Sequence, residues 1–235
     1  MTHAAFFPVS ERAMLVELGK EISGDIRLAI RQFTDLLDQQ NYPWLIEYIP
    51  AFTNVTIIFD LLYFKNNPEE SHIFIQKKME ELLFTLRNKQ TESAGSRTVK
   101  VPVCYDEEFG LDLEWVANYN RISKEEVISL HSQGTYPVYM IGFSPGFPYL
   151  GGMDEKIAAP RKEKPRGKIP AGSVGIAGTQ TGIYPLETPG GWQIIGRTPV
   201  PLFDPAKNPP VLLQAGDTVE FYPISKDEYF RLKES

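Results

Sequence analysis

The chain has 235 residues, of which 30 are Asp or Glu and 24 are Lys or Arg, so its net charge is −6. An acidic chain is poorly suited to nonspecific nucleic-acid binding, because such binding depends on surplus basic residues. The length suits one large domain or two small ones. The single cysteine, Cys104, excludes a disulfide within the chain and favours a reducing compartment.

The N-terminal residues lack the basic region and apolar core of a signal peptide, and no stretch approaches the roughly 20 apolar residues of a membrane span. We therefore expect a cytoplasmic protein without membrane contact. Cys104 lies in the alternating run TVKVPVCYD, which is typical of a strand and predicts a buried thiol.

The first part of the chain predicts a small α+β domain. A strand is expected at residues 13–18, followed by a helix that Ser23 caps and that extends to about residue 40. Two strands follow at residues 44–49 and 54–60, and Pro68 opens a second helix. This order is the split βαβ arrangement without its last strand. The apolar residues at helical spacing are Ile26, Ile30, Phe33, Leu36 and Leu37, then Ile75, Met79, Leu82, Leu83 and Leu86.

A polar segment without periodicity, KQTESAGSR, separates two regions of different character. We place a linker at residues 91–97, between an N-terminal domain of residues 1–90 and a C-terminal domain of residues 98–235. Beyond Gly134 short strands alternate with Gly and Pro, which favours a β-barrel or sandwich. The elements expected before that point are a strand at residues 99–105 and helices at residues 111–119 and 124–132.

Residues 139–198 are rich in Gly and Pro, with aromatic and basic side chains between them. Gly and Pro build turns that bring the backbone close to a ligand. Five basic residues and one acid lie between Pro160 and Pro170, and such a strip suits an anionic ligand or an acidic partner surface. Tight turns with solvated lysines explain the same composition, so both interpretations stay open. Within the strip, Lys162 and Lys164 are expected to face solvent.

Residues 142–146 match the G-x-S-x-G nucleophile elbow, but Ser144 is followed by Pro145, which lacks the amide that the elbow uses in its oxyanion hole. The histidine of that elbow follows the serine, whereas all three histidines here precede it. No clustered metal ligands and no phosphate-binding loop are present in the sequence. His131, near the end of a predicted helix, is either favoured there by the helix dipole or faces the cleft of the Gly-rich segment.

Seven long motifs spread over nearly the whole chain carry a resemblance to a known family. In chain order they are SERAMLVELG, EYIPAFTNVTIIFD, GFSPGFPYLGG, PRKEKPR, PAGSVGIAGTQTGIYP, TPGGWQIIGRTP and LLQAGDTVEFYPI. They resemble the KipI/PxpB family, also called allophanate hydrolase subunit 1, which is related to the carboxyltransferase region of urea carboxylase. The resemblance implies an α+β protein in which a small split-βαβ N-terminal domain precedes a cyclophilin-like β-barrel domain, without implying isomerase activity.

Two functions are implied by the resemblance. In the first, the chain is inactive alone but joins a C-like subunit and an A-like subunit to open 5-oxo-L-proline to L-glutamate with ATP, which acts through the complex. In the second, it inhibits the autophosphorylation of a sporulation sensor histidine kinase. Carboxyl transfer is a weaker third possibility, because the chain has no biotin-attachment lysine between methionines. We expect neither metal nor biotin on this chain.

A cleft on the barrel is the expected site. His131, as a proton shuttle, and Arg166 and Arg197, as fixed cations for developing charge, are the residues expected to be catalytic. Amides near Gly172 and Ser173 are candidate N–H donors. The resemblance implies that substrate is bound by the residues at the family's motif positions, which are Phe143, Pro145, Gly146, Phe147, Tyr149, Arg161, Pro170, Gly172, Ser173, Gln180, Tyr184, Gly191 and Trp192.

Overall fold

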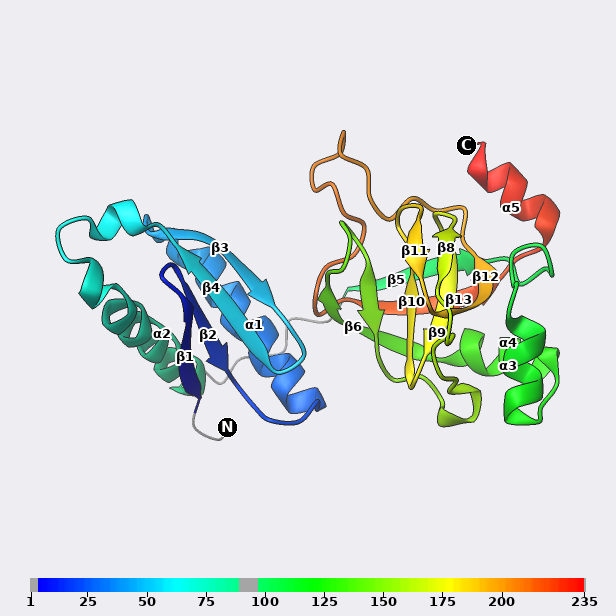
Figure 1. The fold of residues 1–235 in the computed structure, drawn as a ribbon, viewed down its shortest axis with the longest axis horizontal. Helices are drawn as coiled ribbons and strands as arrows, with labels where there is room; N and C mark the ends of the chain where they lie inside the picture. Colours follow the sequence, from blue (N-terminus) through cyan, green and yellow to red (C-terminus); the bar gives the residue numbers. More distant parts are fainter. Residues whose placement is uncertain (1–3, 89–96, 235) are drawn as a thin grey trace. The chain divides into compact units, whose positions relative to one another are not determined.

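A computed structural model describes residues 4–88 and 97–234, which divide into two compact units, Met1–Gly95 and Ser96–Ser235 (Figure 1). Each unit is considered by itself. The expected linker at residues 91–97 lies outside the described residues, apart from Arg97. In the described ranges, no helix combines the length and apolar character needed to span a bilayer.

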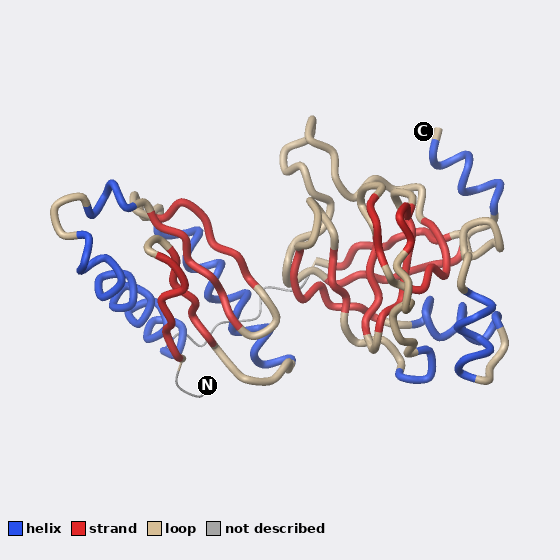
Figure 2. Tube along the Cα trace, in the orientation of Figure 1, coloured by secondary structure: helices blue, strands red, loops and turns tan. Residues whose placement is uncertain are grey.

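The N-terminal unit is an antiparallel sheet with two helices (Figure 2). The strand order is β1-β2-β4-β3, and alternate residues of β4 point into a core formed with the apolar faces of α1 and α2. In chain order the elements are β1 (Ala5–Ser10), β2 (Ala13–Glu17), α1 (Gly24–Gln40), β3 (Leu45–Pro50), β4 (Asn54–Phe59), the 3₁₀ turns η1 (Leu61–Phe64) and η2 (Pro68–Glu70), and α2 (Ser71–Asn88).

The predicted strands and helices of this unit are confirmed to within a few residues, and the Ser23 hydroxyl caps α1 by accepting from the Ile26 amide at 3.2 Å. Strand β1 was not predicted. It contains Pro8 and exposes Phe7 and Val9, so it lacks the alternation of a half-buried strand. Its edge position tolerates the proline, because an edge strand needs no ladder bond on its outer side.

The C-terminal unit contains a larger sheet, with helices beside it. In chain order its elements are β5 (Thr98–Val103), α3 (Leu113–Asn120), α4 (Lys124–Gln133), β6 (Thr135–Ile141), β7 (Pro148–Leu150), η3 (Glu155–Ile157), β8 (Arg166–Ile169), β9 (Ser173–Ala177), β10 (Gln180–Ile183), β11 (Thr188–Gly190), β12 (Gln193–Arg197), β13 (Thr218–Pro223) and α5 (Lys226–Lys233).

The larger sheet curls strongly. Its order is β12-β9-β10-β7-β6-β13-β5, with β5 parallel to β13 and the other neighbours antiparallel. The two edges meet where Cys104 and Arg197 exchange backbone hydrogen bonds of 2.8 and 2.9 Å. The chain is therefore a mixed α+β protein with a curled, barrel-like sheet, and the separate pair β11-β8 carries part of the basic strip. The Cys104 thiol is buried, as expected.

Candidate functional site

A hollow of about 280 Å³ lies in the C-terminal unit and gathers much of the Gly-rich segment. Seven residues predicted to bind substrate line it, and three more, Pro165, Pro189 and Gly190, were not predicted. The seven are Phe143, Phe147, Tyr149, Arg161, Tyr184, Gly191 and Trp192. The segments that supply them are far apart in sequence, and the strand pairing of β10 with β7 and β9 brings them together.

The wall of the hollow is a cluster of aromatic rings around Phe147. Its ring lies 5.0 Å from Tyr149, 5.2 Å from Tyr184 and 5.5 Å from Trp192, measured between ring centroids. The contacts with Tyr184 and Trp192 are edge-to-face, an arrangement that stabilises aromatic packing. The cluster therefore offers a rigid apolar surface for a small planar ligand.

Phe143 stands at the hollow in a strained conformation. Its φ of 70° is rare for a bulky residue, and 63% of its surface is exposed. Its ring makes edge contacts with Phe147 at 5.4 Å and Tyr184 at 6.5 Å. Backbone strain of this kind concentrates at functional sites.

Arg161 supplies a positive charge to this wall. Its guanidinium lies 5.8 Å from the centroid of the Trp192 ring, within the range of a cation–π contact. Burial raises the pKa of Tyr184, and the hydrogen bond from the Trp192 amide and the charge of Arg161 offset this only in part. Arg161 is exposed and, within residues 4–88 and 97–234, forms none of the identified ion pairs.

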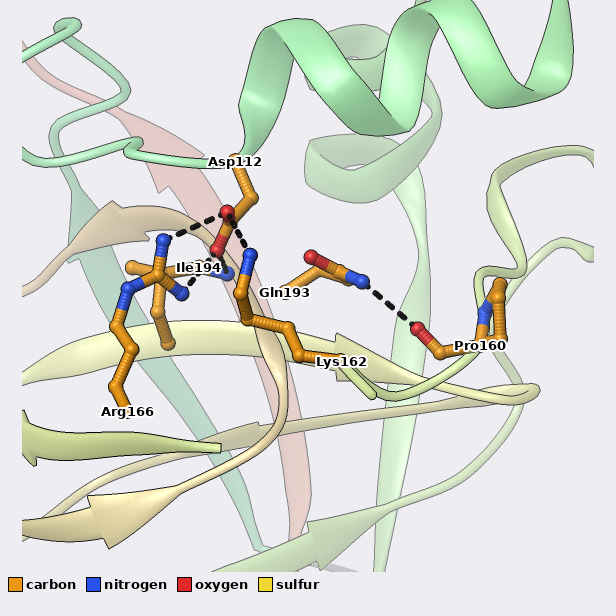
Figure 3. A network of polar contacts seen from close by, with 6 residues as sticks. All are labelled: Asp112, Pro160, Lys162, Arg166, Gln193 and Ile194. Atoms are coloured by element: carbon orange, nitrogen blue, oxygen red, sulfur yellow. Dashed lines mark hydrogen bonds and ion pairs between the residues drawn. The ribbon is translucent and has the colours of Figure 1, made fainter. Parts of the chain in front are cut away.

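A buried carboxylate, Asp112, holds the segment next to Arg161 (Figure 3). Arg166 donates to both carboxylate oxygens at 2.7 Å, and the Lys162 ammonium donates to one of them at 3.0 Å. The Ile194 amide donates to the other oxygen at 2.7 Å. Burial alone raises the pKa of Asp112, but the bonds from Arg166, Ile194 and Lys162 outweigh it and hold the pKa below its usual value.

This network corrects two expectations. Arg166, predicted to be catalytic, does not line the hollow, because its guanidinium forms a bidentate pair with Asp112. Lys162, expected to face solvent, is only partly exposed and binds the same carboxylate, whereas Lys164 is exposed as expected. Asp112 itself was missed by sequence analysis.

His131, for which an orientation toward the cleft was one of two interpretations, does not line the hollow. Its ring is fully buried and stacks on Phe221 with 4.5 Å between centroids. The Thr181 hydroxyl donates to the Gly175 carbonyl, so its oxygen accepts from Nε2–H of His131 at 2.9 Å. Nδ1 then accepts from the Tyr105 hydroxyl at 2.7 Å. Burial lowers the pKa of His131 to about 3, which makes it a neutral core residue.

Arg197, the third residue expected to be catalytic, also lies away from the hollow. It ends β12 at the bridge with Cys104, and its guanidinium lies 5.3 Å from the centroid of the Phe109 ring. Its place in the fold is the closure of the curled sheet and the packing beneath α5.

The remaining predicted residues shape the backbone around the hollow without lining it. Pro145 and Gly146 follow Phe143 in the loop before β7, and Gln180 begins β10. Pro170, Gly172 and Ser173 form the turn into β9. The amides of Gly172 and Ser173 bind the carbonyls of Tyr184 and Pro170 at 2.7 and 3.2 Å, so they are not available as donors to a ligand.

The sequence of both units matches a known family of domains. The family described as carboxyltransferase domain, subdomain C and D, matches residues 4–213, and the chain belongs to this family. Within it, the chain is 48% identical to the B-type subunit of 5-oxoprolinase from Bacillus subtilis (strain 168) over 230 residues, which cover 96% of this chain and 95% of the relative. The similarity therefore extends over both units.

Two further relatives agree with this placement. The chain is 39% identical to the B-type subunit of 5-oxoprolinase from Escherichia coli O157:H7, covering 95% of this chain and 97% of the relative. A crystal structure of a conserved protein from Pyrococcus horikoshii is 43% identical and has a TM-score of 0.56, covering 96% of this chain and all 100% of that one.

Proposed function

We propose that this chain is the B-type subunit of a 5-oxoprolinase, which opens 5-oxo-L-proline to L-glutamate together with A-like and C-like subunits. The observation that carries the proposal is the 48% identity to a B-type subunit of 5-oxoprolinase over nearly the full length of both chains. Identity at this level over both units supports a shared role, because it includes the segments that build the hollow.

The hollow suits one end of the proposed substrate. The face of the five-membered lactam packs on the aromatic wall, and its carboxylate pairs with Arg161, whose planar fork matches a carboxylate. A volume of about 280 Å³ is near the lower limit of small-molecule sites, which fits a ligand of this size. The task of this chain is thus to bind and orient the substrate.

ATP is assigned to the complex and not to this chain, whose sequence has no phosphate-binding loop. Transfer of the γ-phosphoryl group to the lactam oxygen makes the ring carbon electrophilic, and a first water adds to that carbon. The C–N bond then breaks and the nitrogen takes a proton, which leaves an acyl phosphate at the opened end. A second water hydrolyses this acyl phosphate, so that glutamate, ADP and phosphate are released. The positive charge of Arg161 at the hollow favours the anionic substrate throughout.

The finer fold assignment is also a proposal. Strand β1 pairs with β2 at the edge where the last strand of a split βαβ sheet would lie, which supports a rearranged split βαβ N-terminal domain. The meeting of the sheet edges at Cys104 and Arg197 supports a closed, cyclophilin-like barrel in the C-terminal unit. A crystal structure of the chain tests both assignments.

Replacement of Arg161 tests the proposed site within the complex. Arg161→Ala should raise KM for 5-oxoproline on the order of 10- to 100-fold, the effect of losing one charge-assisted hydrogen bond. Lys164→Ala, a change of the same type on an exposed neighbour, is the matched control and should leave KM unchanged. Equal KM values for the two variants would show that the carboxylate binds elsewhere.

A further inference from the structure

Asp112 occupies a position where an aspartate normally caps a helix, yet it caps nothing. It directly precedes α3, and its side chain forms no hydrogen bond with the amides of that helix. An aspartate before a helix ordinarily accepts from those amides. Here the carboxylate accepts from Ile194 in β12, from Lys162 in the segment before β8 and from Arg166 at the start of β8, and only 4% of the residue is exposed.

The segment that Asp112 holds has no regular structure of its own. Residues 161–165 belong to no helix or strand. Three sets of contacts hold this segment and the residues that flank it, in addition to the bond between the Asp112 carboxylate and the Ile194 amide. The Lys162 amide donates to the Gly191 carbonyl at 2.7 Å. The Gln193 side chain donates to the Pro160 carbonyl at 2.9 Å, and Asp112 binds Lys162 and Arg166 (Figure 3).

The two cations on Asp112 are the chain neighbours of the two residues that this segment places on the hollow. Arg161 precedes Lys162, and Pro165 precedes Arg166. The Asp112 carboxylate therefore holds a side chain at each end of the segment, and the bond from the Lys162 amide to the Gly191 carbonyl holds its backbone. We infer that Asp112 is a positioning residue that holds Arg161 over Trp192 and so sets the affinity of the hollow for an anionic substrate.

Electrostatics favours the same role. Asp112 carries one negative charge and accepts from two cations, so without it Lys162 and Arg166 repel each other in a partly buried place. They then turn to solvent and the segment moves with them. Asp112 is not among the residues that line the hollow, so its effect on a ligand acts through Arg161. This inference rests on the proposed function for its kinetic test but not for its structural test.

The structural test uses the isolated chain and hydrogen–deuterium exchange followed by mass spectrometry. Asp112→Asn should speed exchange of the Lys162 amide on the order of tenfold, since the segment loses its anchor. The matched control is Asp217→Asn. Asp217 is also buried, also binds an arginine, Arg97, and also accepts from a backbone amide, that of Gln214 at 2.9 Å. Equal exchange of the Lys162 amide in both variants would overturn the inference.

The kinetic test uses the complex assembled with its partner subunits. Asp112→Asn should raise KM for 5-oxoproline on the order of tenfold with a smaller change in kcat, while Asp217→Asn leaves KM unchanged. In an Arg161→Ala background the same change should have no further effect on KM. A rise of equal size in both backgrounds would show that Asp112 acts independently of Arg161.

Two outcomes separate failure of this inference from failure of the proposed function. A wild-type complex that forms no glutamate refutes the proposed function and leaves the exchange experiment to decide about Asp112. An active wild-type complex with an unchanged KM in Asp112→Asn refutes the inference alone. If Asp112→Asn does not fold, Lys162→Ala removes one of its bonds at a partly exposed side chain, and it should change KM and exchange in the same direction.

Discussion

Acidification is predicted to destabilise the fold through His131. Burial lowers the pKa of this ring from 6.5 to about 3, so the native ring stays neutral where the ring of the unfolded chain titrates. The unfolded state therefore binds the proton first as the pH falls. His131 contributes its full stability above pH 6.5, and this contribution is lost progressively as the pH falls toward 3.

The magnitude follows from the difference between the two states. A pH of 5 lies about 1.5 pH units below the pKa of the ring in the unfolded chain, and each unit corresponds to about 1.4 kcal/mol. The free energy of unfolding therefore falls by about 2 kcal/mol between pH 8 and pH 5. This is a large share of the roughly 5–15 kcal/mol that stabilises a typical protein.

Urea unfolding followed by circular dichroism at pH 8, 7, 6 and 5 measures this effect in the wild type and in His131→Gln. Glutamine keeps a donor for Thr181 and an acceptor for the Tyr105 hydroxyl. The variant should be less stable at pH 8 but should lose about 2 kcal/mol less between pH 8 and pH 5. The same loss in both proteins, or a His131 ring that titrates in this range by NMR, would refute a neutral, buried histidine.

Two further predictions separate residues that hold the site from residues nearby. Arg166→Lys keeps the charge but loses the bidentate fork on Asp112, so it should weaken the activity of the assembled complex, whereas Lys164→Ala should leave activity intact, with circular dichroism unchanged for both. Equal activities would show that the basic strip is a solvated surface. Gly172→Ala should cost at least about 1–3 kcal/mol of unfolding free energy, because φ is +81° and a Cβ would lie 2.3 Å from the Thr198 carbonyl oxygen. Gly167→Ala, with no atom near its Cβ position, is the control, and a similar melting temperature for both would contradict this reasoning.

The spacing of apolar residues along the chain predicted most of the fold, because apolar residues recur at the positions that are buried. The helices α1 and α2 each bury one apolar face, and their positions follow from that spacing. Strand β1 was not predicted because residues 7–10 are all exposed, so its sequence lacks the alternation of apolar and polar residues. Helix α5 was not predicted because it buries only Tyr229 and so shows no apolar face at helical spacing. Its capping box of Ser225 and Glu228 is nevertheless visible in the sequence.

The residues of the site that lie in the family's motifs could be predicted from the sequence. The residues that depend on long-range pairing could not. The aromatic, Gly and Arg motifs pointed to the residues of the hollow. Asp112 was not visible, because its partners Lys162, Arg166 and Ile194 lie 50, 54 and 82 residues later in the chain. Both interpretations of His131 stayed open because a helix C-terminus does not show which way a ring turns. Kinase inhibition stays a prediction, since no described contact bears on a kinase.

The most direct test of the proposed function is reconstitution by omission. The A-like and C-like partner subunits are mixed with 5-oxoproline and ATP, with and without this chain, and L-glutamate and ADP are measured together. We predict glutamate and ADP in equal amounts when all three are present, and no glutamate when this chain is left out or is supplied alone. Equal glutamate formation with and without this chain, or none in the complete mixture, would contradict the proposed function.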